Sequence, residues 1–143
     1  MNNIKEYDFV VYGATGFTGK LVVEYLVHKY SNNSQIKWAL AGRNQNKLES
    51  VAASKNVPEG TGLLEVDSNH IASIEEMISK TKCVLTTVGP YQLYGNNIVS
   101  ACAKSGIDYV DLCGEPGWMH EKINELTETA RETGSRIVFS CGF

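Results

Sequence analysis

This sequence lacks several features that would place it in a specialised class of protein. Its four cysteines form no C-x-x-C pair, which argues against a zinc site or a disulfide framework and favours free thiols in a reducing compartment. The formal net charge is -3 and no cationic stripe occurs, so neither nucleic acid nor an anionic membrane is an expected partner. No signal segment and no membrane-length apolar run is present. We therefore expect a cytoplasmic protein with no metal site and no membrane-spanning segment.

Repeats, linkers and low-complexity segments are also absent, and a length of 143 residues suits one domain. Short apolar runs alternate with amphipathic stretches, the pattern of a parallel sheet covered by helices on both faces. Strands are expected over residues 8–12, 36–41, 62–66, 83–88, 109–112 and 136–140. Helices are expected over residues 18–30, 45–54, 70–80, 96–105 and 119–133. Right-handed crossovers then give an α/β fold, a Rossmann doubly wound parallel sheet in three α/β/α layers with strand order 3-2-1-4-5-6.

Local signals mark the faces and ends of these helices. In the first helix, the side chains expected to lie on the sheet share helical spacing: Leu21, Val22, Tyr25, Leu26 and Tyr30. Ser73 and Glu76 have the spacing of a capping box, with a helix start a few residues earlier as the alternative. Gly106 and Gly134 follow the fourth and fifth helices, where left-handed caps are expected. Both of these helices therefore have identifiable ends.

The segment from Gly13 to Gly19 is the most informative part of the sequence. It reads G-A-T-G-F-T-G and joins the first expected strand to the first expected helix. In this pattern one glycine permits a tight turn, the next lets a pyrophosphate approach the backbone, and the third lets the helix pack closely on the strand. A purely structural turn is the alternative. We interpret the segment as a dinucleotide-binding turn, with binding residues Gly13, Thr15, Gly16, Phe17, Thr18 and Gly19.

The residue after the second expected strand indicates which dinucleotide binds. Enzymes that prefer NAD usually have an acidic residue here for the ribose 2′-hydroxyl, whereas this chain has Arg43. No acidic residue occurs between Glu24 and Glu49, and a guanidinium can hold a 2′-phosphate through two hydrogen bonds. Lys47, one turn into the next helix, adds a second positive charge. A solvated arginine at a loop tip is the alternative; we favour NADP(H) over NAD(H).

Two further strand ends are expected to contribute to the cofactor site. Asp67 follows the third strand, where it either contacts the adenine or caps the next helix, and the sequence leaves both open. After the fourth strand, small residues leave room for the nicotinamide ribose and hydroxyls can bond to it, with a structural turn as the alternative. The residues predicted to bind the cofactor there are Thr87, Val88, Gly89, Pro90 and Tyr91.

No residue of the sequence is assigned as a catalytic proton donor. Tyr25 and Lys29 have the Y-x-x-x-K spacing of short-chain dehydrogenases, but they lie on the first helix behind the glycine turn, so we interpret the match as coincidence. The three histidines lie on expected helices. Cys113 and Cys141 follow strands, where cysteines are usually small packing residues. Glu115 and Tyr91 are candidates for lining the pocket.

Four segments at these spacings closely resemble the N-terminal domain of the saccharopine dehydrogenase-like oxidoreductases, the group that includes the trans-acting enoyl reductases. They are V-Y-G-A-T-G-F-T-G from Val11, A-L-A-G-R from Ala39, T-T-V-G-P-Y with Y-G from Thr86, and Y-V-D-L-C-G-E from Tyr109. Many dehydrogenases share the glycine motif, whereas V-G-P-Y-x-x-Y-G and D-L-x-G-E are much more specific. The resemblance covers nearly the whole chain.

This resemblance implies a two-domain, NADP-dependent oxidoreductase in which residues 1–143 form the nucleotide-binding domain. A larger domain after Phe143 would bind the small-molecule substrate and form a homodimer, so we expect an N-terminal fragment that binds the cofactor without turnover. Relatives act on an amino-acid conjugate or on lipid intermediates, and the sequence does not choose between them. The alternative function is a non-catalytic NADP(H)-binding module that senses redox state or regulates a partner, and a fold with an empty site is a third.

Overall fold

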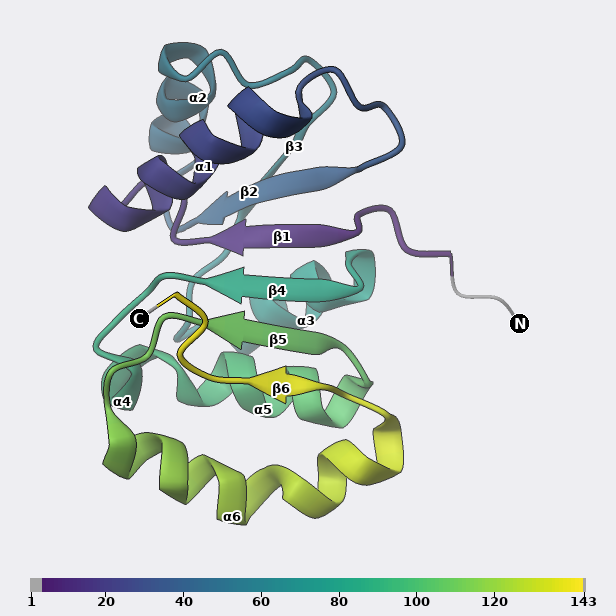
Figure 1. Cartoon of the computed structure of the whole chain (residues 1–143), viewed down its shortest axis with the longest axis vertical. Helices are drawn as coiled ribbons and strands as arrows, with labels where there is room; N and C mark the ends of the chain where they lie inside the picture. The colour runs from purple at the N-terminus through teal and green to yellow at the C-terminus, as the bar shows by residue number, and fades with distance from the viewer. Residues whose placement is uncertain (1–3, 143) are drawn as a thin grey trace.

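A computed structural model describes residues 4–142 as a parallel sheet with helices on both faces (Figure 1). The strands are β1 (Phe9–Tyr12), β2 (Trp38–Gly42), β3 (Gly62–Glu65), β4 (Cys83–Thr86), β5 (Asp108–Asp111) and β6 (Ile137–Val138). The helices are α1 (Phe17–Tyr30), α2 (Gln45–Ser54), α3 (Ile71–Lys80), α4 (Tyr91–Tyr94), α5 (Asn96–Ser105) and α6 (Pro116–Thr133). The strand order is β3-β2-β1-β4-β5-β6, and all neighbouring strands are parallel. The predicted doubly wound fold is confirmed.

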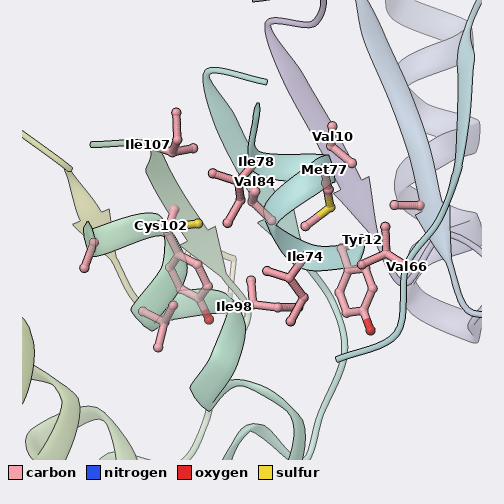
Figure 2. Packing of buried hydrophobic residues seen from close by; sticks show 14 of the residues in the cluster. Val10, Tyr12, Val66, Ile74, Met77, Ile78, Val84, Ile98, Cys102 and Ile107 are labelled. Atoms are coloured by element: carbon pink, nitrogen blue, oxygen red, sulfur yellow. The ribbon is translucent and has the colours of Figure 1, made fainter. Parts of the chain in front are cut away.

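The two faces of the sheet bury separate hydrophobic clusters. Side chains alternate along β1, so Val10 and Tyr12 belong to the cluster under α3, α5 and α6, whereas Val11 belongs to the cluster under α1 and α2. Figure 2 shows the first of these, where Met77 of α3 and Ile98 of α5 lie over the strands. Removing this apolar surface from water is the main favourable contribution to folding.

The buried face of α1 differs from the predicted stripe. Val23 and Leu26 are buried, whereas Leu21 and Tyr25 are 53% and 57% exposed, so the prediction is wrong for these last two residues. The rotation of α1 about its own axis, which is set by the close contact of Gly19, explains why Leu21 and Tyr25 face away from the sheet. Gly19 is buried against the turn before it, and Val23 and Leu26 lie one and two turns further along the same face of the helix.

The ends of the helices follow the predictions in part. Gly106 and Gly134 have φ values of 71° and 82° and cap α5 and α6 in the left-handed region, as predicted. Of the two alternatives for α3, the earlier start is confirmed: the helix begins directly after His70, and the Ser73 hydroxyl donates to the His70 carbonyl at 2.7 Å instead of forming a capping box. Helix α6 begins at Pro116, ahead of its predicted start, since proline is favourable in a first helical turn.

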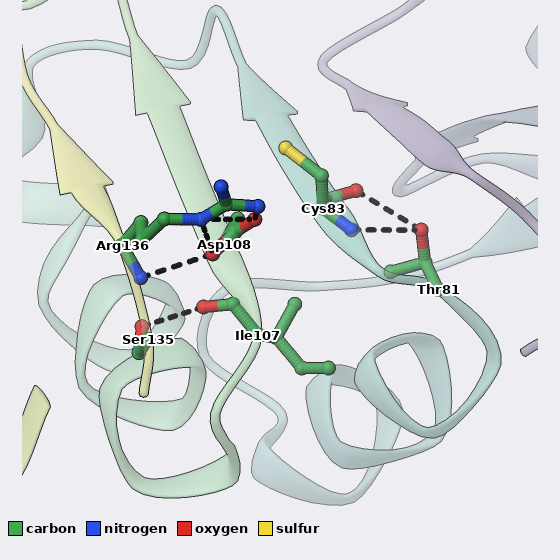
Figure 3. A network of polar contacts seen from close by, with 6 residues as sticks. All are labelled: Thr81, Cys83, Ile107, Asp108, Ser135 and Arg136. Carbon is green, nitrogen blue, oxygen red and sulfur yellow. Dashed lines mark hydrogen bonds and ion pairs between the residues drawn. The ribbon is translucent and has the colours of Figure 1, made fainter. Parts of the chain in front are cut away.

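The last strand, β6, lies at one edge of the sheet and has no buried residue. Val138 of β6 is 52% exposed. Polar contacts hold the start of β6 to the start of β5 (Figure 3): the Arg136 guanidinium donates to the Asp108 carboxylate, and the Ser135 hydroxyl donates to the Ile107 carbonyl at 2.6 Å. Across residues 4–142, none of the helices combines the length and the apolar character needed to cross a membrane.

Candidate functional site

A groove of about 340 Å³ opens at the carboxyl ends of β1, β2 and β4. Doubly wound sheets bind ligands where the strand order reverses, and here that point lies between β1 and β4. The residues that line the groove are Tyr12, Gly13, Thr15, Gly16, Phe17, Thr18, Gly19, Gly42, Arg43, Ser68, Thr87, Val88, Gly89 and Tyr94. A larger cavity of about 590 Å³ lies at the amino ends of the strands, among the segments that precede β1, β2 and β3. The predicted glycine turn lies in the first cavity, which is therefore the candidate site.

Three glycines shape the first wall of this groove. Gly13 has φ of 91°, and a Cβ atom there would lie 2.7 Å from the Thr87 hydroxyl oxygen. A Cβ atom on Gly19 would lie 1.8 Å from the carbonyl oxygen of Gly13. At Gly16 the same atom would have its nearest neighbour at 3.4 Å, so this position is less crowded. Helix α1 can therefore start this close to β1 only because Gly19 has no side chain, and the missing side chain of Gly13 leaves room for Thr87 and Val88.

The amino end of α1 is arranged to receive an anion. Gly16 is the N-cap residue of α1, and no side-chain oxygen of the cap accepts from the N–H groups of the first turn. The first turn also contains no acidic residue. Its exposed residues Phe17 and Thr18 line the groove. The partial positive charge of the helix terminus thus faces the groove, where a phosphate group would be stabilised.

The end of β2 supplies the cationic side of the groove. Arg43 is exposed, follows β2 directly and lines the groove. Lys47 is also exposed, but it lies in α2 and is not among the lining residues. Its backbone N–H donates to the Asn44 side chain at 3.1 Å, which caps α2. Arg43 is therefore the basic side chain that this wall presents directly.

Asp67 and Ser68 follow β3 at the same end of the sheet. Asp67 does not cap α3, because its carboxylate accepts from the Asn69 N–H at 2.8 Å and His70 is the cap residue. Ser68 is 4% exposed and lines the groove, and the Asn97 side chain donates to its carbonyl at 2.8 Å. Sequence reasoning missed Ser68, whose only signal is its position just after a strand.

Tyr12 lies between the two walls of the groove and is 2% exposed. Burial raises the pKa of its phenol, while hydrogen bonding to Ser68 and the charge of Arg43 partly oppose that shift. The phenol therefore keeps its proton at neutral pH. Tyr12 therefore adds no negative charge to the groove, which is lined by the amino end of α1 and by Arg43.

The loop after β4 forms the second wall. Thr87, Val88 and Gly89 line the groove. The Thr87 N–H donates to the Tyr12 carbonyl at 3.0 Å, so the loop continues alongside β1 beyond the end of the strand. Tyr94 of α4 also lines the groove. Sequence reasoning missed Tyr94 because α4 has only four residues, too few to show a helical period.

Pro90 and Tyr91 follow this wall in the chain and are not among the residues that line the groove. Pro90 follows Gly89 through a cis peptide bond and precedes α4. The Tyr91 side chain is 5% exposed; its hydroxyl donates to the Thr86 carbonyl at 3.1 Å and accepts from the Leu112 N–H at 3.2 Å. Burial raises the pKa of Tyr91 to about 12, so the hydroxyl remains a donor at neutral pH. Tyr91 therefore ties the end of β4 to the end of β5.

A buried carboxylate organises the chain after β5. Asp111 is 1% exposed and accepts from the Tyr109 hydroxyl at 2.6 Å. It also accepts from the backbone N–H groups of Cys113 and Ser140, each at 2.9 Å. Burial and the neighbouring Asp111 charge raise the pKa of Tyr109 well above its usual value. The phenol thus remains a donor, and the ends of β5 and β6 are tied together through one side chain.

The residues considered for proton transfer lie outside the groove. Lys29 Nζ is 5.8 Å from the centre of the Tyr25 ring, and both side chains are on the exposed face of α1. Cys113 is buried, and burial raises the pKa of its thiol. Glu115 does not line the groove; its carboxylate accepts from the Tyr91 N–H at 2.6 Å. The arrangement can bind a dinucleotide, and it assigns no catalytic acid.

Comparison with known families and proteins agrees with this assignment. The model of the saccharopine dehydrogenase NADP binding domain matches residues 9–138. A trans-acting enoyl reductase of Mycobacterium tuberculosis is 42% identical over 141 residues, which cover 97% of this chain and 33% of that protein. Its counterpart from Mycobacterium ulcerans is 40% identical over 140 residues, with the same shares covered. The chain thus spans about a third of the length of these curated relatives.

Solved structures share the fold at low sequence identity. The saccharopine dehydrogenase (L-Glu forming) of Saccharomyces cerevisiae superimposes with a TM-score of 0.72 at 15% identity, over 95% of this chain and 27% of that one. The triphenylmethane reductase of Citrobacter sp., complexed with NADP(H), has a TM-score of 0.66 at 22% identity, over 92% of this chain and 48% of that one. These likenesses support the architecture of the sheet and its helices.

Proposed function

This chain belongs to the family of saccharopine dehydrogenase NADP-binding domains, and on that premise we propose how its groove holds NADP(H). The pyrophosphate lies on the glycine turn at the amino end of α1, and the adenosine 2′-phosphate lies against Arg43. One observation carries the proposal: the arginine and the uncapped helix end line the same groove. The helix end follows β1 and the arginine follows the neighbouring strand β2, the arrangement in which one dinucleotide is bound across a doubly wound sheet.

The other residues of the proposed site contact or surround the remaining parts of the cofactor. The turn residues Gly13, Thr15, Gly16, Phe17, Thr18 and Gly19 surround the pyrophosphate. Thr87, Val88 and Gly89 contact the nicotinamide ribose. Tyr91 supports that wall by tying the end of β4 to the end of β5, and Pro90 leads from the wall into α4. Lys47 contributes its charge at longer range, and Asp67 shapes the turn that presents Ser68 to the adenine.

We extend the proposal to the longer protein that the relatives represent. Residues 1–143 would act as the N-terminal nucleotide-binding domain of a cytoplasmic two-domain oxidoreductase, with hydride passing to or from the nicotinamide. The substrate, of lipid or enoyl type, would bind through the second domain, which would also form a homodimer. Support comes from the trans-acting enoyl reductases, which are 42% identical to this chain and about three times as long.

The test of the proposed cofactor site is calorimetric titration of NADPH and NADH into the 143-residue chain and into Arg43→Ala. Loss of one charge-assisted phosphate contact should weaken NADPH binding roughly 10- to 100-fold and change NADH binding less than about twofold. Arg131→Ala is the matched control, because Arg131 is exposed on α6 and pairs with Glu128 there. Equal affinity for both cofactors, unchanged by Arg43→Ala, would overturn the proposal.

A further inference from the structure

Glu115 makes a pair of contacts across the carboxyl edge of the sheet. One carboxylate oxygen, Oε2, accepts from the Tyr91 N–H at 2.6 Å, and the other, Oε1, accepts from the Gln92 N–H at 3.1 Å. Glu115 itself is the N-cap residue of α6, and its carbonyl accepts from the Met119 N–H at 3.1 Å. One residue therefore joins the start of α4 to the start of α6, although the two helices begin more than twenty residues apart.

These contacts satisfy backbone groups that α4 cannot satisfy by itself. The first N–H groups of a helix have no partner within it, and Pro90 ahead of α4 carries no side-chain oxygen that could serve as a cap. A carboxylate is a strong acceptor for such groups because its hydrogen bonds are charge-assisted. Both oxygens of Glu115 are used in this way, so the side chain is committed to holding α4.

Helix α4 and the turn before it form the second wall of the groove. Gly89 lies two residues ahead of α4 and Tyr94 is its last residue, and both line the groove, whereas Glu115 does not. The ring of Tyr91 packs against Trp118 of α6 at a centroid distance of 5.6 Å, which supports the same region from the apolar side. Fixing the Tyr91 and Gln92 N–H groups therefore fixes the wall on both sides of them.

This wall lies at the nicotinamide end of the proposed cofactor. The glycine turn occupies the middle of the groove, and Arg43 places the 2′-phosphate, hence the adenosine, on the β2 side. The nicotinamide half must then extend to the β4 side, which Thr87, Gly89 and Tyr94 line.

Resting on that proposed cofactor site, we propose that Glu115 is a positioning residue for the nicotinamide half of NADP(H). It acts through the backbone of Tyr91 and Gln92, which hold the second wall at the spacing that the nicotinamide riboside needs. Glu115→Gln keeps the shape of the side chain but replaces one acceptor oxygen by an amide donor that faces a backbone donor. The wall should then loosen while the glycine turn and Arg43 stay in place.

The experiment compares two ligands that share one half. NADPH and adenosine 2′,5′-bisphosphate, which has no nicotinamide riboside, are titrated by calorimetry into the 143-residue chain, Glu115→Gln and Glu115→Asp. Glu115→Gln should weaken NADPH binding about tenfold and change binding of the bisphosphate less than about twofold. Glu115→Asp keeps the charge and should recover part of the loss. Glu132→Gln, an exposed position near the other end of α6, is the matched control and should change neither affinity.

Amide hydrogen exchange supplies a readout without ligand. The Tyr91 and Gln92 amides should exchange faster in Glu115→Gln than in the unchanged chain, while amides of β1 should keep their rates.

In the titrations, equal weakening of binding of both ligands, or an unchanged affinity for NADPH, would overturn the role of Glu115. Failure of the unchanged chain to bind either ligand would instead overturn the proposed cofactor site. Should Glu115→Gln not fold, the same comparison is made with Glu115→Asp, where an unchanged ratio of the two affinities overturns the inference.

Discussion

The two walls of the groove are built by opposite means. The glycine turn depends on the absence of atoms: a Cβ on Gly19 would lie 1.8 Å from the Gly13 carbonyl oxygen. The second wall depends on the presence of a polar side chain after β5, because Glu115 accepts from the Tyr91 and Gln92 N–H groups at the start of α4. Asp111 accepts three further hydrogen bonds, which hold the ends of β5 and β6 together. The structure of the glycine turn depends on the volume available there, and the structure of the second wall depends on the matching of hydrogen-bond donors and acceptors.

This difference predicts which substitutions each wall tolerates. The glycine turn should be sensitive to a single added methyl group, because backbone atoms occupy the space and cannot move without separating α1 from β1. The polar contacts around β5 should be sensitive to changes that keep the volume constant but turn an acceptor into a donor. Volume and polarity can therefore be varied separately to test the comparison.

The largest effect is expected for Gly19→Ala. The added methyl group collides with the Gly13 backbone, so α1 must move away from the sheet, and the free energy of unfolding should fall by about 3 kcal/mol or more. NADPH binding should be lost together with the turn. Urea denaturation followed by far-UV circular dichroism measures the stability, and calorimetric titration measures the binding.

Gly117→Ala is the control for that substitution. Gly117 lies in α6, and a Cβ atom there would meet nothing within 4 Å. Because alanine is the better helix former, the variant should be as stable as the unchanged chain or more stable by up to about 1 kcal/mol. Similar losses in both glycine variants would show that crowding is not what makes residue 19 special.

An intermediate effect is expected for Asp111→Asn. The volume is unchanged, but an amide has one acceptor oxygen, which the Cys113 and Ser140 N–H groups need. The NH₂ group then faces the Tyr109 hydroxyl, whose buried proton loses its present acceptor, with a cost of about 2 kcal/mol in unfolding free energy. Asp108→Asn, on the same strand, should cost less because its partner Arg136 is 83% exposed (Figure 3). Urea denaturation of the two variants side by side makes the comparison, and the reverse order would contradict the importance of the buried carboxylate.

The contrast between a local glycine turn and contacts that join distant segments also explains how far the sequence could predict the site. The glycine turn and Arg43 were predictable, because the spacing of glycines and the residue after the second strand are local patterns, and both line the groove. The strand order followed from the alternation of apolar runs and helices and is confirmed. Ser68 and Tyr94 were missed, since short loops and a four-residue helix have no periodicity, and for Tyr94 the V-G-P-Y-x-x-Y-G segment was the available signal.

The polar contacts around β5 were beyond sequence reasoning for a different reason. Glu115 and Tyr91 are 24 residues apart, and only the pairing of β4 with β5 brings them together. The sequence suggested that both side chains line the pocket. In the structure the Tyr91 side chain is buried, and the Glu115 carboxylate binds the backbone at the start of α4. A strand-end position therefore predicted the neighbourhood of these residues but not the groups that they contact.

The smallest effect is expected in acid at Asp108, which lies at the amino end of β5, away from the groove. Hydrogen bonding to the Arg136 side chain is the main cause that lowers the pKa of Asp108 below its usual 3.8. Because the folded pKa is the lower one, the contribution of Asp108 to stability is present above about pH 5 and disappears as the pH falls through the folded pKa. The difference in unfolding free energy between the unchanged chain and Asp108→Asn, measured by urea denaturation from pH 7 to pH 2, should therefore shrink toward the acid end. The corresponding difference for Gly19→Ala should stay constant, since a collision with a carbonyl oxygen involves no proton. A constant difference for Asp108→Asn as well would mean that the charge at the start of β5 contributes nothing to stability.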